Sequence, residues 1–566
     1  MRARGVISTA LNQRKSPGGN GFAAGLLIAG AVIALAFLTV FFAWPVANMI
    51  ARGFMPDGAV DLGGFADVFS SPRTWRIVGY TILNGVLGTS IAVVLALPGA
   101  YVLYRCSFPG QRLLRGIVTV PFVLPTVVVG VAFRSLLIET GPLGFLGLDG
   151  TYTAIVLALV FFNYSVIVRS VGGMWARLDP RATEAAAALG APPARRFLTV
   201  TLPQLTPAIA SSASVVFLFC ATAYGVVLVL GGTTYGTIET EIWMQTTQFL
   251  NLRAASVLSV VQLVVVAAAL WVAGRARRSR ERALVMRARV DRPLDLRRDA
   301  FSVAITAVVV LGLLAAPMLS LLLRSFQTPH GWGIQNYVNL GTTGGRNALT
   351  VTVWEALGNS LRVAAWATLI AVVLGAIVAI ILSTRPRNPI AARSVGLLDA
   401  VFMLPLGVSA VTVGFGFLIT LNRPPFDLRS SMILIPIAQA IVALPLVVRT
   451  VLPVLRAIDP RQREAAAVLG AGPIKTFATV DAPPLVRSLG LALGFAFAIS
   501  LGEFGATSFL ARPDAPTLPV VIFRLIGRPG AENFGMALAA CVILAAMTAT
   551  VMIAAERLRT NSEGEW

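Results

Sequence analysis

The sequence predicts an all-α integral membrane protein with about twelve membrane-spanning helices, arranged as two parallel six-helix repeats. Three observations lead to this prediction. The 566 residues are 56% hydrophobic and only 13% charged, with a mean hydropathy of +0.80, so most of the chain cannot be the surface of a soluble domain. Apolar runs of about 20 residues, enough to cross the ~30 Å hydrocarbon layer, recur along the whole chain. The second half of the sequence also repeats the first.

The predicted spans are separate apolar runs, six on either side of a strongly polar central stretch. Basic residues cluster in alternate connections, which the positive-inside rule places in the cytosol together with both termini. The first run lacks a small-residue cleavage site after it, so we expect a retained first helix rather than a removed signal peptide. The predicted spans are Phe22–Val46, Ile77–Tyr104, Ile117–Leu137, Tyr152–Val171, Ile209–Leu230, Ala254–Gly274, Phe301–Leu323, Leu361–Leu382, Leu397–Leu421, Met432–Val448, Leu489–Leu510 and Met536–Ala555.

The polar stretch at 275–300 holds ten arginines and four acids. We interpret it as a cytosolic linker whose charge fixes the topology, and a lipid-binding or regulatory site is the alternative. It divides the chain into two units with a cytosolic tail at each end. The predicted divisions are a tail at 1–21, a first unit at 22–274, the linker at 275–300, a second unit at 301–555 and a tail at 556–566.

The net charge of +21, from 46 basic and 25 acidic residues, would suggest nucleic acid as the partner of a soluble protein. In a membrane chain it is a topology signal, and we expect no nucleic-acid partner. The chain has three cysteines, each in or beside an apolar run, and one histidine, His330, in a predicted external loop. These residues exclude a Cys/His metal cluster, so we expect no metal site and no catalytic residue.

The repeat places matching residues 280 positions apart in the two halves. Because each repeat holds an even number of spans, both enter the membrane in the same sense, and a pseudo-two-fold axis along the membrane normal should relate them. We therefore expect a central pathway between the halves. The matches include Phe122–Pro125 with Phe402–Pro405, Leu178–Arg181 with Ile458–Arg461, Glu184–Ala186 with Glu464–Ala466, Gly190 with Gly470, Pro203 with Pro483, and Tyr224–Gly225 with Phe504–Gly505.

The most informative repeated segment is the cytosolic connection at Asp179–Gly190. Its Asp suits a helix N-cap, Pro180 the first helical position, the alanines the helix body and Gly190 the position just past the end. The pattern predicts a short helix outside the bilayer, with a twin at Asp459–Gly470. Two such helices on a two-fold bundle indicate docking elements for a two-fold partner.

These segments resemble the EAA loop of ATP-binding-cassette importer permeases, in which the helix docks into a groove on the nucleotide-binding subunit. The first loop covers 178–203 and the second 458–483, and the second departs from the pattern at Ala482, where the family has Leu. The residues that the resemblance assigns to coupling are Glu184, Ala185, Ala186, Gly190 and Pro203 in the first loop, and Glu464, Ala465, Ala466, Gly470 and Pro483 in the second. Each glutamate could meet a cation on the partner or on a neighbouring loop of this chain.

The resemblance extends over nearly the whole chain, because two such permease domains in tandem look like the thiamine and ferric-iron importer permeases. It implies the type I importer permease fold in the cell inner membrane, two copies of an ATPase subunit that bind ATP and Mg²⁺, and an extracytoplasmic solute-binding protein. It also implies a small molecule or ion as substrate. Neither Lys15 nor Lys475 lies in a phosphate-binding Gly-Lys-Ser/Thr motif, so we expect no ATP hydrolysis and no bound cofactor on this chain.

A few residues within the predicted spans are candidates for the pathway or its gate. Glu503 is the one acid that we place inside a span, and it either faces the pathway or pairs with an arginine for structural reasons. Asn163 either lines the pathway or holds helices together by a hydrogen bond across them, and Tyr224 repeats as Phe504. Pro125 and Pro405 should kink spans three and nine near the axis.

Two other classes of function fit the sequence less well. A twelve-span ion-coupled secondary transporter of the major facilitator type shares the parallel symmetry, but it should carry a Gly/Asp/Arg-rich loop between spans two and three. The loop at 105–112 reads RCSFPGQR and does not fit. A membrane-embedded enzyme would need clusters of His, Cys or acids within the spans, which the sequence lacks.

Overall fold

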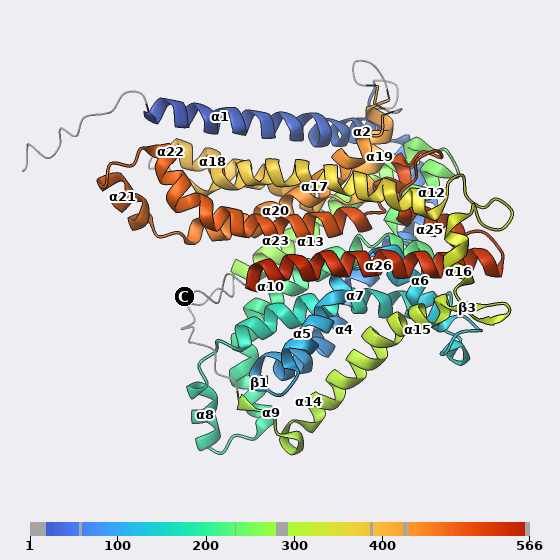
Figure 1. Cartoon of the computed structure of the whole chain (residues 1–566), viewed down its shortest axis with the longest axis horizontal. Helices are drawn as coiled ribbons and strands as arrows, with labels where there is room; N and C mark the ends of the chain where they lie inside the picture. The colour runs from blue at the N-terminus through green and yellow to red at the C-terminus, as the bar shows by residue number, and fades with distance from the viewer. Residues whose placement is uncertain are drawn as a thin grey trace, which may run out of the picture.

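The computed structural model describes residues 19–55, 59–232, 234–278, 292–384, 389–422, 427–428 and 431–560. Half of the predicted linker, 279–291, and most of both predicted tails lie outside these ranges. The described chain is a bundle of long helices that run roughly side by side, with short helices gathered at its two ends (Figure 1). In a membrane core, helices satisfy every backbone polar group internally, which is why the apolar runs of this sequence form them.

The elements before the linker are α1 (Gly19–Leu38), η1 (Thr39–Ala43), α2 (Trp44–Phe54), α3 (Gly63–Ser70), α4 (Pro72–Arg105), β1 (Cys106–Ser107), α5 (Gln111–Thr119), η2 (Val120–Val123), α6 (Thr126–Leu137), η3 (Gly144–Leu146), α7 (Tyr152–Trp175), α8 (Arg181–Ala188), α9 (Pro193–Arg196), η4 (Phe197–Thr201), α10 (Leu202–Ala221), α11 (Gly225–Leu230), α12 (Ile238–Thr247) and α13 (Leu252–Arg278).

The elements after it are β2 (Arg292–Pro293), α14 (Leu296–Val308), η5 (Val309–Ala315), α15 (Ala316–Ser325), β3 (Gln327–Thr328), β4 (Gly331–Trp332), α16 (Gln335–Val338), η6 (Asn339–Gly341), α17 (Val353–Ser383), α18 (Pro389–Met403), η7 (Leu404–Gly407), α19 (Ala410–Thr420), α20 (Leu434–Ala457), α21 (Pro460–Val468), α22 (Pro473–Thr476), η8 (Phe477–Asp481), α23 (Ala482–Gly502), α24 (Thr507–Leu510), α25 (Leu518–Ile526) and α26 (Ala531–Thr560). The segments η1, η4, η5 and η8 are π-helical turns, and the other η segments are 3-10 turns.

The predicted all-α membrane fold is confirmed. Ten helices in the described ranges are long and apolar enough to cross a membrane, and a bent pair makes an eleventh. That pair, Gln111–Val123 and Thr126–Leu137, turns through 106° and corresponds to the third predicted span. The ninth predicted span is likewise divided into α18, η7 and the 11-residue α19.

The first helices of the two halves are exchanged. In the first half, α1 and α2 pack on α17 and α19 of the second, while α14 and α15 of the second half pack on α4 and α6 of the first (Figure 1). Small residues permit this contact: a Cβ at Gly30 would lie 2.8 Å from Cγ2 of Ile377. The Ser135 and Ser320 hydroxyls of α6 and α15 lie 3.2 Å apart. Each sequence repeat therefore completes its bundle with a helix from the other.

Buried apolar side chains form three clusters, one in each half and one between the halves. The cluster between the halves joins residues from both repeats, among them Tyr224, Phe415 and Phe504. The two sheets are two-stranded and peripheral. Strand β1 pairs in parallel with β2, and β3 pairs antiparallel with β4. The β1–β2 pair fastens the end of the linker to the first half, where Arg292 contacts Asp299 at 2.5 Å.

Candidate transport site

The two predicted cytosolic helices are present as α8 and α21, which project from the same end of the bundle (Figure 1). Asp179 Oδ1 accepts a hydrogen bond from the Arg181 N–H at 3.1 Å, and Asp459 Oδ1 accepts from the Arg461 N–H at 2.9 Å. A carboxylate at this position satisfies a backbone donor that the helix leaves free. The same cap therefore starts both helices.

Both helices also end in the same turn. Gly190 and Gly470 adopt the left-handed conformation, with φ of 79° and 80°. The Ala191 N–H bonds the Ala186 carbonyl at 3.0 Å, and the same bond joins Ala471 to Ala466 at 3.0 Å. This is the Schellman motif, which satisfies the last carbonyls and turns the chain sharply away. Glycine is needed here because residues with a Cβ are strained at this φ.

The outer faces of α8 and α21 are uncovered. Leu189 is 88% exposed and its counterpart Leu469 is 87% exposed, although both are large and apolar. Glu184 and Glu464 are exposed, and neither forms an ion pair with another described residue of this chain. A repeated apolar patch with a free carboxylate beside it is suited to contact another protein.

A continuous stretch of helix connects each exposed helix to a membrane span. After α9 and α22 the chain makes the π-turns η4 and η8 and runs on into α10 and α23. Pro203 and Pro483 each lie at the second position of the following helix and have no N–H to donate. The matching loss of a backbone bond in both halves is consistent with the π-turns just before these prolines. Movement of α8 or α21 can thus be transmitted directly to a spanning helix.

The two proline candidates do not occupy equivalent places, although they match in the sequence register. Pro125 is the N-cap of α6, directly at the 106° bend, whereas Pro405 lies earlier, inside η7. The N-cap of α19 is Ser409, and Pro121 in η2 takes the place that Pro405 has in η7. The local offset is thus 284, because Ser409 and Pro125 differ by that number. The third and ninth predicted spans are therefore interrupted helices, whereas the sequence predicted a kink within each one.

The fifth and eleventh spans end earlier than predicted. The helix α10 ends at Ala221 and α23 ends at Gly502, and each is followed by a tight turn and a short helix, α11 or α24. The two turns face each other between the halves. Tyr224 and Phe504 stack there with ring centroids 5.3 Å apart and planes 19° apart. The Tyr224 hydroxyl also lies 3.1 Å from Ser508 Oγ of the opposite turn.

Glu503 lies in one of these turns, not within a helix as predicted. Its carboxylate accepts hydrogen bonds from the Ala506 N–H at 2.7 Å and from the Thr507 N–H and hydroxyl at 3.1 and 2.5 Å. These bonds cap the short helix α24. Among the described residues no arginine pairs with Glu503, so the predicted structural ion pair is wrong, and its place in a turn between the halves leaves the pathway role a prediction.

Asn163 bonds across helices. Its amide donates to the Leu159 carbonyl at 2.8 Å within α7 and to Cys220 Sγ of α10 at 3.4 Å. Asn163 is 2% exposed and stands away from solvent. It joins two spans of the first half, a contact that serves helix packing.

Two short helices that the sequence analysis did not predict, α12 (Ile238–Thr247) and α25 (Leu518–Ile526), follow the turns. Hydroxyls of long spans cap their starts: Thr81 accepts from the Ile238 N–H at 3.0 Å, and Ser360 accepts from the Leu518 N–H at 2.7 Å. The rings of Trp243 and Phe523, 280 residues apart in sequence, meet edge to face with centroids 5.8 Å apart. A second pair of equivalent rings thus lies on the two-fold axis.

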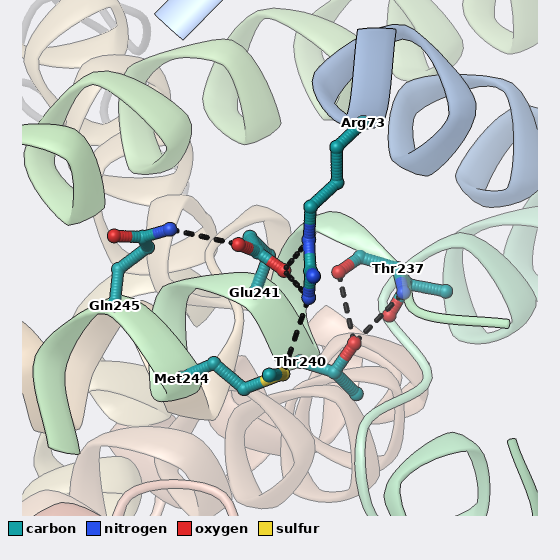
Figure 2. Close-up of polar contacts among 6 residues, drawn as sticks. All are labelled: Arg73, Thr237, Thr240, Glu241, Met244 and Gln245. Atoms are coloured by element: carbon teal, nitrogen blue, oxygen red, sulfur yellow. Dashed lines mark hydrogen bonds and ion pairs between the residues drawn. The ribbon is translucent and has the colours of Figure 1, made fainter. Parts of the chain in front are cut away.

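The helix α12 carries two buried acids with different surroundings. Figure 2 shows Arg73, at the start of α4, reaching Glu241, which lies 2.9 Å from the guanidinium. Gln245 donates to the other oxygen of Glu241 at 2.8 Å, and Thr237 and Thr240 cap the helix (Figure 2). Glu239 is fully buried and faces the second half, where Ser409 Oγ donates to its Oε2 at 2.8 Å. A signal was present in the sequence: Thr237 begins a capped helix that carries these acids.

An open cavity of about 760 Å³ lies at the start of α17, on the end of the bundle away from α8 and α21. Trp354, Glu355, Arg362 and Asp514 are among its lining residues. A hydrogen bond from the Arg512 guanidinium holds the pKa of Asp514 below its usual range. The cavity therefore offers both charges and an indole ring to the medium.

Comparison with known proteins places these features in a family. Residues 86–278 match the family described as binding-protein-dependent transport system inner membrane component. The thiamine transport system permease protein of Brucella abortus (strain 2308) is 25% identical over 503 residues, which cover 85% of this chain and 87% of that protein. The corresponding protein of Escherichia coli (strain K12) is 25% identical over 471 residues, 81% of this chain and 85% of its own.

Other similarities cover about half of the chain. A Salmonella typhimurium permease protein named for 2-aminoethylphosphonate transport is 28% identical over 230 residues, 41% of this chain and 81% of its own. A chain from a bacterial ABC transporter involved in the import of alginate aligns with 18% identity and a TM-score of 0.40, over 45% of this chain and 96% of that one. The family match at residues 86–278, together with relatives whose alignments run through both halves, supports an ATP-binding-cassette importer permease in which two permease units are fused.

Proposed function

We propose that this permease carries thiamine inward across the cell membrane, driven by a separate dimer of ATPase subunits and supplied by an extracytoplasmic binding protein. The single observation that carries the proposal is the duplication of the coupling helix. The helices α8 and α21 share their caps, their left-handed glycine and their exposed apolar residue. Two identical docking elements fit a partner with two-fold symmetry.

The ATPase contact is assigned to the exposed faces of these helices. Small side chains keep the surface of both helices narrow enough to enter a groove; they are Ala185, Ala186, Ala465 and Ala466. Leu189 and Leu469 would fill apolar pockets, and Glu184 and Glu464 would meet cations on the partner. ATP and Mg²⁺ would bind on the partner subunit, and this chain would hold no cofactor.

The mechanism is a rigid-body movement. When the ATPase subunits close on ATP, they would draw α8 and α21 together, and the π-turns η4 and η8 would pass the movement to α10 and α23. The central turns lie at the far ends of those two helices. Separation of the turns would break the Tyr224–Phe504 stack and open the pathway outward. The predicted residue Pro125, at the bend before α6, would act as a hinge beside this gate.

The orientation follows from the arginine distribution. The end of the bundle that carries α8 and α21 is assigned to the cytosol, together with both termini and the linker at 275–300. The opposite end, with α12, α16, α25 and the cavity at the start of α17, would receive the binding protein. The two permease units are assigned to 22–274 and 301–555.

Thiamine is favoured over ferric iron or another small solute by the relatives that match this chain through both halves, which are named for thiamine transport. The experiment is affinity purification of the tagged chain from its native membrane, followed by uptake of radiolabelled thiamine into vesicles that contain the purified complex. An ATPase subunit should co-purify, and uptake should require ATP. If no ATPase co-purifies, the coupling proposal is wrong. If the complex hydrolyses ATP but moves no thiamine, only the substrate is wrong.

A further inference from the structure

The surroundings of Glu239 differ from those of every other buried carboxylate described above. It is 0% exposed, and its Oε2 accepts one bond, from Ser409 Oγ across the interface between the halves. Its Oε1 has no hydrogen bond of regular geometry from a described residue, and the amide of Gln262 is the other polar side chain that interacts with this carboxylate. Glu241 has Arg73 and Gln245, and Glu503 has three donors. A buried carboxylate with a free oxygen is costly unless something else compensates it.

Two glutamine side chains beside the central turns add free acceptors. Gln262 Nε2 donates to the Ala221 carbonyl at 3.4 Å, at the end of α10. Gln439 Nε2 donates to Thr507 Oγ at 3.2 Å, at the start of α24. These partners fix the orientation of both amides, so each Oε1 is left without a donor within the described structure. The centre of the protein therefore holds several buried acceptor oxygens for which the described structure supplies no hydrogen-bond donor.

Aromatic rings occupy the axis itself. Tyr224 stacks on Phe504, Phe504 lies 5.4 Å from Phe523, and Phe523 meets Trp243 at 5.8 Å. Trp243 follows Glu239 by four residues on α12, which places both on the same face of the helix. We name these four rings the ring column. Any solute that moves along the two-fold axis has to pass it.

The contacts that close this region all join one half to the other. They are the Tyr224–Phe504 stack, the Tyr224–Ser508 contact, the Trp243–Phe523 contact and the Glu239–Ser409 hydrogen bond. When the halves separate, the same movement frees ring faces and the Glu239 carboxylate. A ring face is negative, and the carboxylate ionises once separation exposes it to water, so both attract a cation. An anion such as a phosphonate would be repelled.

We infer that the ring column and Glu239 form a subsite that selects organic cations with a planar ring. In this subsite the ring of the solute stacks between the separated aromatic faces, and its positive charge and N–H groups face Glu239, Gln262 and Gln439. The inference rests on the proposed import function and adds the chemical class of solute that the pathway itself accepts. Selection would then occur in the permease as well as in the binding protein.

The test compares two substitutions on the same helix in the native host. Chromosomal Glu239→Gln removes the free charge and keeps an oxygen for Ser409, whereas the control Glu241→Gln removes an equally buried charge that is already paired. Uptake of radiolabelled thiamine, a ring cation, is measured against concentration and normalised to the permease in the membrane. We expect Glu239→Gln to raise KM by about tenfold to a hundredfold, the effect of one charge-assisted hydrogen bond. Glu241→Gln should leave KM within about twofold, and Glu239→Asp should recover part of the affinity.

A second measurement does not depend on thiamine being the transported solute. The purified complex in nanodiscs, held with a non-hydrolysable ATP analogue, is titrated with N-methylpyridinium and with methylphosphonate, an anion that carries no cationic group. The ring cation should bind, Glu239→Gln should weaken it at least about tenfold, and the phosphonate should not compete. Equal KM and equal binding in wild type and Glu239→Gln would overturn the inference. If the wild-type protein takes up no thiamine but still binds N-methylpyridinium through Glu239, only the proposed substrate is wrong.

Discussion

Tyr224 and Phe504, which lie 280 residues apart and occupy equivalent positions in the two repeats, stack on each other with 5.3 Å between their centroids. Residues related by a two-fold axis can touch only where they lie on that axis. The stack therefore marks the axis, and both rings are buried, at 6% and 2% exposure. A transport pathway on the axis is closed at this level by a pair of planar rings.

Removal of both rings should make the permease leaky. We expect the double variant Tyr224→Ala, Phe504→Ala to release trapped small solutes from proteoliposomes without ATP, because the cavity left behind is large enough to admit water. The measurement is efflux of a radiolabelled solute. The control is Phe133→Ala, which removes one ring of a buried pair inside the first half, with centroids 5.6 Å apart. Phe133→Ala should lower thermal stability without causing a leak. Equal efflux from both variants would show that Tyr224 and Phe504 do not close the pathway.

The glycines that end the coupling helices should be required for coupling. Gly190→Ala with Gly470→Ala forces a Cβ into a left-handed turn, at a cost of about 1–2 kcal/mol for each turn, and should change the exit direction of α8 and α21. Uptake should fall while ATP hydrolysis by the complex persists. The control is Gly173→Ala, in the helix α7, where an added Cβ meets nothing within 4 Å. Normal uptake in the double glycine variant would refute this role.

The exposed leucines should determine ATPase binding without affecting folding. Leu189→Asp with Leu469→Asp places charges on a surface that is 88% and 87% exposed in the isolated chain. Thermal unfolding should be unchanged, because surface substitutions of this kind cost about 0.5 kcal/mol or less. Co-purification of the ATPase should be lost. The measurement is the ratio of the two proteins on a gel, and retention of the ATPase would argue that docking occurs elsewhere.

The contact between Arg73 and Glu241 should stabilise the position of α12. Arg73→Ala leaves a carboxylate that is 4% exposed without its cation, and we expect a loss of about 1–3 kcal/mol, since Arg73 itself is 47% exposed and partly screened. The double variant Arg73→Ala, Glu241→Gln should recover much of that loss. Thermal unfolding in detergent measures both. Additive effects of the two single substitutions would show that the pair does not interact.

Much of the fold could be predicted because its causes are local. Hydropathy located all the long helices, because each apolar run must form its own backbone bonds in a membrane. The caps of α8 and α21 are likewise local, since Asp459, Pro460 and Gly470 act within a few residues of each other. Pro125 marked the position of the bend before α6, but its size was not predicted, and the break after α10 was missed because the chain stays apolar through it and hydropathy does not register a change of direction.

The central site was predicted less well. Glu503 was found as a buried acid, but it caps its own turn, whereas Glu239 is the carboxylate with a free oxygen. Glu239 lies in a segment too short and polar to read as part of the membrane, and only the packing of α12 against α19 of the other half buries it. The exchange of the first helices between the two halves could not be predicted either, because no local residue pattern indicates which bundle a helix will join.

The class of protein, the order of the ten long helices in the described ranges, the two-fold repeat and the short helices α8 and α21 all follow from the sequence, because they depend on hydropathy and on interactions between residues close along the chain; two of the twelve predicted spans are broken helices. Which residues meet on the two-fold axis depends on how the two halves pack together. The contacts of Tyr224 with Phe504, of Trp243 with Phe523 and of Glu239 with Ser409 join residues 170 to 280 positions apart. Such contacts form when two whole bundles pack against each other, and no local pattern specifies them.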